Sequence, residues 1–167
     1  MEGGHPRPRP AGASGGLVNP GGVVMTMYER IGGEPTIRKL AEEFHASAMR
    51  DPLLYPKFVR GRPAHLENLV TFLVEMFGGP ARYSAEHGGT AGMLAAHRRL
   101  RVTGEQAERF VELMLAAADV AGLPADDHFR TAFAQHLRNG TGFTVKFSQP
   151  DSPTPPQPFP PIQPWSW

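Results

Sequence analysis

Apolar residues recur at steps of three and four in several separate stretches of the chain. This spacing places them on one face of a helix, and no stretch shows the sustained alternation of a half-buried strand. The clearest apolar faces consist of Ile37, Leu40, Ala41, Phe44 and Ala48, then Leu66, Leu69, Val70, Leu73 and Phe77, then Phe110, Leu113, Met114 and Ala117. The pattern therefore predicts an all-α domain.

Glycine and proline interrupt these faces and mark the expected helix ends. We expect helices over residues 27–31, from Pro35 to about 48, from Pro63 to 77, over roughly 92–99, over 104–121 with Thr103 as cap, and from 126 to about 139. Residues 51–62 and 81–92 are expected to be irregular. Helices of unequal length joined by such breaks indicate an orthogonal helical fold rather than a uniform four-helix bundle.

The two ends of the chain differ in composition from its middle. Glycine and proline dominate residues 1–24, and prolines recur through residues 148–167, so neither segment offers much apolar surface to offset ordering entropy. We therefore expect a disordered N-terminal tail over 1–24, one domain over 25–147 and a proline-rich disordered tail over 148–167. A solvated C-terminal tail is the favoured interpretation, and docking of Phe159, Trp165 or Trp167 is the alternative.

Composition and charge exclude several classes of function. The 167 residues carry a net charge of +1, so no global field attracts nucleic acid or an anionic membrane. The chain has no cysteine, which excludes disulfides and thiolate chemistry and fits a reducing compartment. No run approaches a membrane span of about 18–20 apolar residues, and the start lacks a signal-peptide pattern. We expect a cytoplasmic protein without nucleic-acid or membrane partners.

Three histidines have neighbours that suit a buried site. His45 lies at the edge of an apolar helix face, His65 shares a face with Leu69, and His97 ends the apolar and small-residue segment 93–96. Taken alone, a histidine in such a position more often has ordinary hydrogen-bond partners than binds a metal. A zinc site would usually need a fourth donor, and no HExxH motif is present. A haem pocket instead needs one strong imidazole and a large apolar slot.

With these residues in place, the chain resembles the truncated haemoglobins. The resemblance extends over roughly Met27 to Asn139 and rests on an ordered set of motifs. These are Tyr28–Gly33, Phe44-His45, Asp51–Leu54, Phe58, Phe72–Pro80 with Tyr83, and Leu94–Val102. It implies a truncated globin fold, which is a two-over-two helical sandwich, and haem b (iron protoporphyrin IX) as the cofactor.

The same resemblance implies a role for each matching residue. His97 corresponds to the histidine that binds the haem iron, and Phe58 to an aromatic side chain that packs on the haem. His65 takes the distal position that faces a bound ligand, and His45 stands where a distal tyrosine is common. The remaining haem contacts implied are Phe44, Leu69, Phe72, Met76, Leu94, Val102, Phe110 and Met114. The second ring nitrogen of His97 needs an acceptor, such as a backbone carbonyl of its own helix.

The subgroup implied is group II-like or intermediate between groups I and II. The loop after Gly79 resembles group II, whereas the segment from His97 to Leu100 is closer to group I. Many group II members have tryptophan at the position of Phe110 and tyrosine at that of His45. The basic residues that could pair with haem propionates are Lys57, Arg98, Arg99 and Arg101.

The resemblance implies reversible binding of a diatomic gas, which is O2, NO or CO, as in oxygen binding or transport. It leaves open an NO dioxygenase or peroxidase-like side activity, a reductase partner, ligation of the iron by a distal histidine, and a monomer or a weak homodimer. Three alternatives stay open beside it. They are a non-haem helical interaction module, a metal-dependent hydrolase using His45, His65 and His97 with Glu42 or Glu86, and a haem sensor or carrier.

Overall fold

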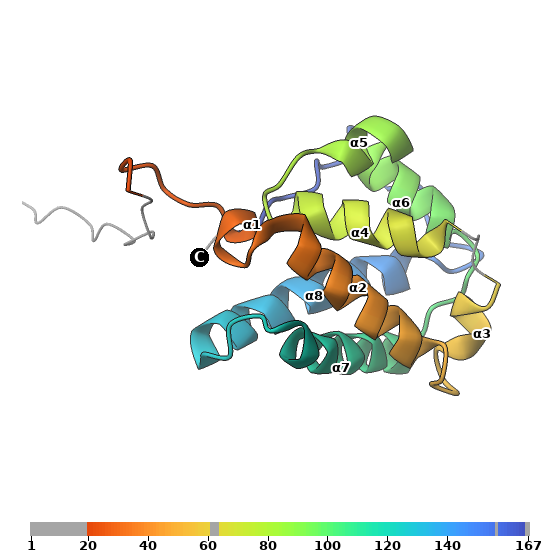
Figure 1. Cartoon of the computed structure of the whole chain (residues 1–167). Coiled ribbons are helices and arrows are strands. Elements are labelled where there is room, and N and C mark those ends of the chain that lie inside the picture. Colours follow the sequence, from red (N-terminus) through yellow and green to blue (C-terminus); the bar gives the residue numbers. More distant parts are fainter. Residues whose placement is uncertain (1–19, 61–63, 156, 166–167) are drawn as a thin grey trace, which may run out of the picture.

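The computed structural model describes residues 20–60, 64–155 and 157–165 (Figure 1). In these ranges the chain forms α1 (Met27–Arg30), α2 (Gly33–Ala48), α3 (Tyr55–Phe58), α4 (His65–Met76), α5 (Arg82–His87), α6 (Gly89–His97), α7 (Gly104–Ala121) and α8 (Asp127–Phe147). Apart from a single-residue bridge at Val24, the described residues contain no β-structure, which confirms the all-α prediction. No helix among them has the length and apolar character needed to cross a membrane.

Helix α2 occupies the centre of the fold and packs against both α4 and α7, and α7 packs in turn against α8 (Figure 1). The four long helices thus form two stacked pairs, with the core between them. Its largest fully buried side chains are Phe44, Phe77, Phe129, Phe133, Ile37, Leu40, Leu73 and Met114. Burial of each such side chain contributes about 1.5–3 kcal/mol, so these contacts hold the long helices together.

Local signals set the start and end of α7 as predicted. The Thr103 side chain accepts a hydrogen bond from the backbone N–H of Gln106, and the Gln106 side chain accepts one from the Thr103 N–H. This capping box satisfies two N–H groups that the first helical turn leaves free. At the other end Gly122 adopts a left-handed conformation with φ of 79°, which glycine tolerates without steric cost.

Residues 82–87 form helix α5 and α6 already begins at Gly89, so the prediction of an irregular segment over 81–92 is wrong over most of its length. The cause is the carboxylate of Glu75, which is only 6% exposed. It accepts a hydrogen bond from the backbone N–H of Ser84 at 2.8 Å and another from the Ser84 hydroxyl. Because a carboxylate on α4 caps this helix, its own sequence carries no start signal.

Helix α8 continues to Phe147 rather than ending near Gly140, so the predicted end is wrong by about two turns. Glycine inside a helix costs about 1 kcal/mol relative to alanine, and this segment contains both Gly140 and Gly142. Packing offsets that cost, because the rings of Phe143 and Phe147 lie 4.6 Å apart and α8 contacts α6.

The connection between α2 and α4 contains the one-turn helix α3, although residues 51–62 were expected to be irregular. Asp51 orients this connection by accepting hydrogen bonds from the backbone N–H groups of Leu53 and Leu54 and from Arg109 of α7. The Arg109 guanidinium lowers the pKa of the Asp51 carboxyl, and the two backbone hydrogen bonds act in the same direction. The connection places Phe58 beside α2.

The C-terminal segment is docked at its end, which differs from the expectation of a solvated tail. Trp165 is 7% exposed, and its ring stacks on Phe133 at 5.4 Å with an interplanar angle of 12°. Its backbone N–H donates to the carbonyl of Met76 at 2.6 Å. The expected disorder of residues 1–19 and the alternative of a docked Trp167 concern positions outside the described residues.

We expect Trp165→Ala to lower the free energy of unfolding by about 3–5 kcal/mol, because the substitution leaves a cavity against three phenylalanine rings. Urea denaturation of the apoprotein measures this change. Val120→Ala is the control, since Val120 is 55% exposed and its truncation should change stability by less than about 0.5 kcal/mol. Equal stability of the two variants would contradict the docked position of Trp165.

Candidate functional site

Five aromatic and imidazole rings meet where α2, α3, α4 and α7 converge. Phe58 lies 5.7 Å from Phe44 and 4.9 Å from His65, measured between ring centroids. His45 lies 5.8 Å from His65, and Phe110 of α7 lies 4.5 Å from Phe44. The fold therefore brings together five of the side chains that the sequence analysis assigned to one pocket, from segments far apart in the chain.

His97 is the last residue of α6, and it is half-buried. Its Nδ1 lies 2.8 Å from the backbone carbonyl of Met93, one helical turn earlier. A carbonyl oxygen only accepts hydrogen bonds, so Nδ1 carries a proton, and in the neutral imidazole Nε2 then keeps its lone pair. This is the tautomer that a metal ligand needs, and the acceptor belongs to the same helix as His97, as the sequence analysis expected.

Burial and neighbouring charge keep His65 neutral. Desolvation lowers its pKa to about 4, and His45 and His97 add smaller effects in the same direction. Its Nδ1 is buried and has no hydrogen-bond partner among the described residues. A buried polar atom without a partner is uncommon, and it leaves His65 with hydrogen-bonding capacity that the protein does not use.

The remaining predicted lining residues are apolar, and most of them belong to the hydrophobic core or pack against it. Met114 and Met76 are buried in the core between the long helices, and Leu94 is buried on α6 outside that core. The ring of Phe72 lies 5.2 Å from Tyr83 of α5 rather than among the rings around Phe58. The last two predicted lining residues are half-buried. They are Leu69 on α4 and Val102 between α6 and α7.

The four basic residues expected near a cofactor differ in their surroundings. The Nζ of Lys57 donates to the backbone carbonyls of Leu100 and Arg101, so its charge holds the segment that follows His97. The other three candidates are exposed on that same segment: Arg98, Arg99 and Arg101. Lys57 therefore connects α3 to the His97 segment.

Several residues around His97 were not foreseen from sequence. Met93 supplies the carbonyl acceptor, and its spacing of four residues from His97 is the signal that could have identified it. Ser148 and Gln149 donate to or accept from the backbone of Arg101 and Val102, with no local signal in the sequence. They lie in a segment that composition assigned to a tail.

The metal-dependent hydrolase finds no support in the described residues, because no three histidine, cysteine, aspartate or glutamate side chains there converge as a metal site. His45 and His65 lie beside the ring of Phe58 instead, and His97 is bound to the Met93 carbonyl. One imidazole whose Nδ1 is bound to a carbonyl, together with a buried His65 whose Nδ1 has no partner among the described residues, fits a haem site.

The sequence is similar to a known protein family and to several of its members. A family model described as bacterial-like globin matches residues 26–139. A group I truncated haemoglobin of Nostoc sp. is 32% identical over 103 residues, which is 61% of this chain and 83% of the relative. A group II truncated haemoglobin of Bacillus subtilis is 31% identical over 99 residues, 59% of this chain and 74% of the relative.

The fold agrees with solved structures. The group II truncated haemoglobin of Bacillus anthracis superposes with a TM-score of 0.63 at 30% identity, covering 72% of this chain and 90% of that one. The two stacked helix pairs are thus the two-over-two globin arrangement that the resemblance implied. The chain is similar to relatives of both group I and group II, in agreement with the mixture of group I and group II motifs in its sequence.

We expect the stability of the apoprotein to fall as pH decreases from 6.5 to about 4, because only the unfolded chain protonates His65 in that window. The loss attributable to this group is about 2–3 kcal/mol. The measurement is the free energy of unfolding against pH for the wild type and for His65→Gln, in which this contribution disappears. His87→Gln, at a distant histidine, should retain the wild-type dependence, and an equal dependence in His65→Gln would contradict the burial of this imidazole.

Proposed function

Because this chain belongs to the truncated haemoglobins, within the bacterial-like globins, and therefore binds haem, we propose that it holds haem b through His97 and reversibly binds O2 or another diatomic gas. The hydrogen bond between His97 Nδ1 and the Met93 carbonyl carries this proposal. It leaves Nε2 of a neutral imidazole free as a ligand, which donates to iron without adding negative charge.

Haem iron, when bound, supplies the position at which a diatomic gas is held. The chain contributes the surroundings of that position. Phe44, Phe58 and Phe110 form a connected group of rings that excludes water beside His45 and His65. Low water access favours reversible binding over oxidation, because solvent and protons promote loss of the reduced state.

His65 is the proposed donor to the gas ligand. At neutral pH its imidazole is uncharged, since its pKa is about 4, so it has one N–H to donate. A donor held in an apolar environment stabilises a ligand that carries partial negative charge. His45, with its ring 5.8 Å from that of His65, is the second imidazole available on this side.

The first test concerns the iron ligand. We expect purified protein supplied with haemin to develop a Soret band with imidazole ligation, and His97→Gly to lose that ligation. Added free imidazole should restore the wild-type spectrum, because it occupies the space left by the side chain. His87→Gln is the matched control and should bind haem like the wild type.

Two results of this spectrum would contradict the proposal. A wild type that develops no Soret band would favour a non-haem helical interaction module. Unchanged axial ligation in His97→Gly would assign the iron to another histidine. A haem sensor or carrier would instead give the expected spectrum with a cofactor that dissociates readily.

The second test concerns the donor. We expect His65→Leu to increase the O2 dissociation rate about 5- to 150-fold, since one such hydrogen bond contributes about 1–3 kcal/mol. Stopped-flow displacement of O2 by CO measures this rate, with His45→Leu beside it and His87→Gln as the control. An unchanged rate in His65→Leu would remove its assigned role. A six-coordinate spectrum of the ferrous wild type would show that a distal histidine binds the iron itself.

A further inference from the structure

We propose that the C-terminal strap, residues 148–155 and 157–165, holds the first turn of α6 and the segment that follows its last residue, and thereby positions His97 towards the haem. The inference rests on the proposed function for the role of His97, and on the geometry of this chain for the strap. The family model ends at residue 139, so the strap lies outside the residues that define the family match.

The attachment after His97 is made by Ser148 and Gln149. The backbone N–H of Arg101 donates to the Ser148 carbonyl at 3.0 Å, and that of Val102 donates to the Ser148 hydroxyl at 2.9 Å. The Gln149 amide donates to the Val102 carbonyl at 2.9 Å. Ser148 is fully buried, so these hydrogen bonds are protected from competition by water.

The backbone between His97 and this attachment is strained. Arg99 and Arg101 have φ angles of 65° and 52°, in the left-handed region that residues with a side chain rarely adopt. Such conformations persist only where the surroundings enforce them. The hydrogen bonds from Ser148 and Gln149, together with Lys57 on the Leu100 carbonyl, supply that constraint.

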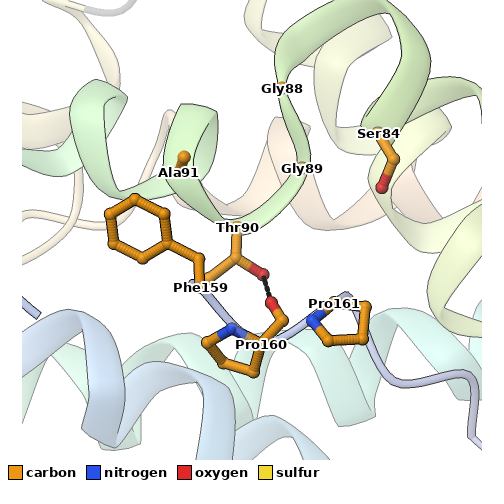
Figure 2. A pocket seen from close by; sticks show the side chains of 8 residues that line it. All are labelled: Ser84, Gly88, Gly89, Thr90, Ala91, Phe159, Pro160 and Pro161. Atoms are coloured by element: carbon orange, nitrogen blue, oxygen red, sulfur yellow. Dashed lines mark hydrogen bonds between the residues drawn. The ribbon is translucent and has the colours of Figure 1, made fainter. Parts of the chain in front are cut away.

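The attachment before His97 is made by the middle of the strap. The hydroxyl of Thr90, in the first turn of α6, donates to the carbonyl of Pro160 at 2.5 Å. Figure 2 shows Phe159, Pro160 and Pro161 lying against the turn from Gly88 to Ala91, where these residues line an open pocket. The strap therefore contacts α6 about two turns before His97.

Trp165 fixes the far end of the strap. Its ring lies between 4.9 and 5.4 Å from those of Phe77, Phe129 and Phe133. The backbone N–H of Trp165 donates to the backbone carbonyl of Met76 in α4. The strap is thus held to the core at one end by the Trp165 side chain and at the other by α8 itself. Because both ends of the strap are fixed, its middle cannot move freely with α6. The hydrogen bond between Thr90 and Pro160 therefore restrains α6.

Restraint at both ends matters because α6 is a single short helix of nine residues. Rotation of such a helix about its axis redirects the side chain at its last position. The Met93 carbonyl moves with the helix, so the His97–Met93 hydrogen bond alone sets the tautomer but not the direction of Nε2. We assign that direction to Thr90 and Ser148 acting as positioning residues.

The test compares Thr90→Val with Thr90→Ser. Valine keeps the shape and branching of threonine but removes the hydroxyl, whereas serine retains it. In the apoprotein, we expect amide hydrogen exchange over residues 89–97 to be about fivefold faster in Thr90→Val than in the wild type, the fold-change for loss of one typical hydrogen bond. Thr90→Ser should restore the wild-type rate.

In the ferrous haem-bound protein, Thr90→Val should shift the iron–histidine stretching frequency measured by resonance Raman spectroscopy, and Thr90→Ser should not. Ser148→Ala tests the second attachment with the same two measurements. Thr141→Val is the control on α8, because the Thr141 hydroxyl donates only within its own helix, to the Arg138 carbonyl. It should change neither measurement.

The exchange rate and the iron–histidine stretching frequency together test the inference. Faster exchange with a shifted frequency supports it, and faster exchange with an unchanged frequency overturns the positioning role. Unchanged exchange in both Thr90→Val and Ser148→Ala overturns the attachment itself, even where haem fails to bind. Failure of the wild type to take up haem would instead overturn the proposed function, which the exchange measurement does not require.

Discussion

The hydrogen bond between His97 and the Met93 carbonyl is the contact on which the proposed haem ligation depends. It determines which imidazole nitrogen carries the proton and which keeps a lone pair for a metal. Because the acceptor lies one turn earlier in the same helix, the bond exists only while the end of α6 is helical. Whatever stabilises this short helix therefore also preserves the proposed iron ligand.

Helix α6 depends on tertiary contacts more than the long helices do. Glycine occupies three of the positions 88–92, and glycine is a poor helix former. Gly92 is required by space, because a Cβ there would lie 1.6 Å from the His87 carbonyl oxygen. The close approach of α5 and α6 thus excludes a better helix former at position 92. Contacts from α8 and from the C-terminal strap compensate for this weakness.

The burial of His65 has two consequences. The rings around His65 remove water from it, which lowers its pKa and keeps the imidazole neutral at physiological pH. The same burial leaves Nδ1 of His65 without a protein partner, which costs stability. A polar group kept dry and unpaired is unfavourable for folding, but it is suited to binding a small polar ligand. The buried imidazole of His65 therefore lowers the stability of the fold but leaves a hydrogen-bonding atom available to a ligand.

Local sequence patterns are sufficient to predict the long helices and the residue types of the site. Apolar periodicity over α2, α4 and α7, and the Thr103 cap, are encoded within a few residues of each other, so local patterns reveal them. The position of His97 one turn after Met93 is equally local. Only the tertiary structure decided that α5 is a helix, that α8 passes Gly140 and that Trp165 enters the core. In each of these cases the stabilising partner is distant in sequence or lies on another element: Glu75 for α5, α6 for the end of α8, and Phe133 for Trp165. Such contacts form only once the chain has folded, because their free energy depends on surfaces that separate helices create together.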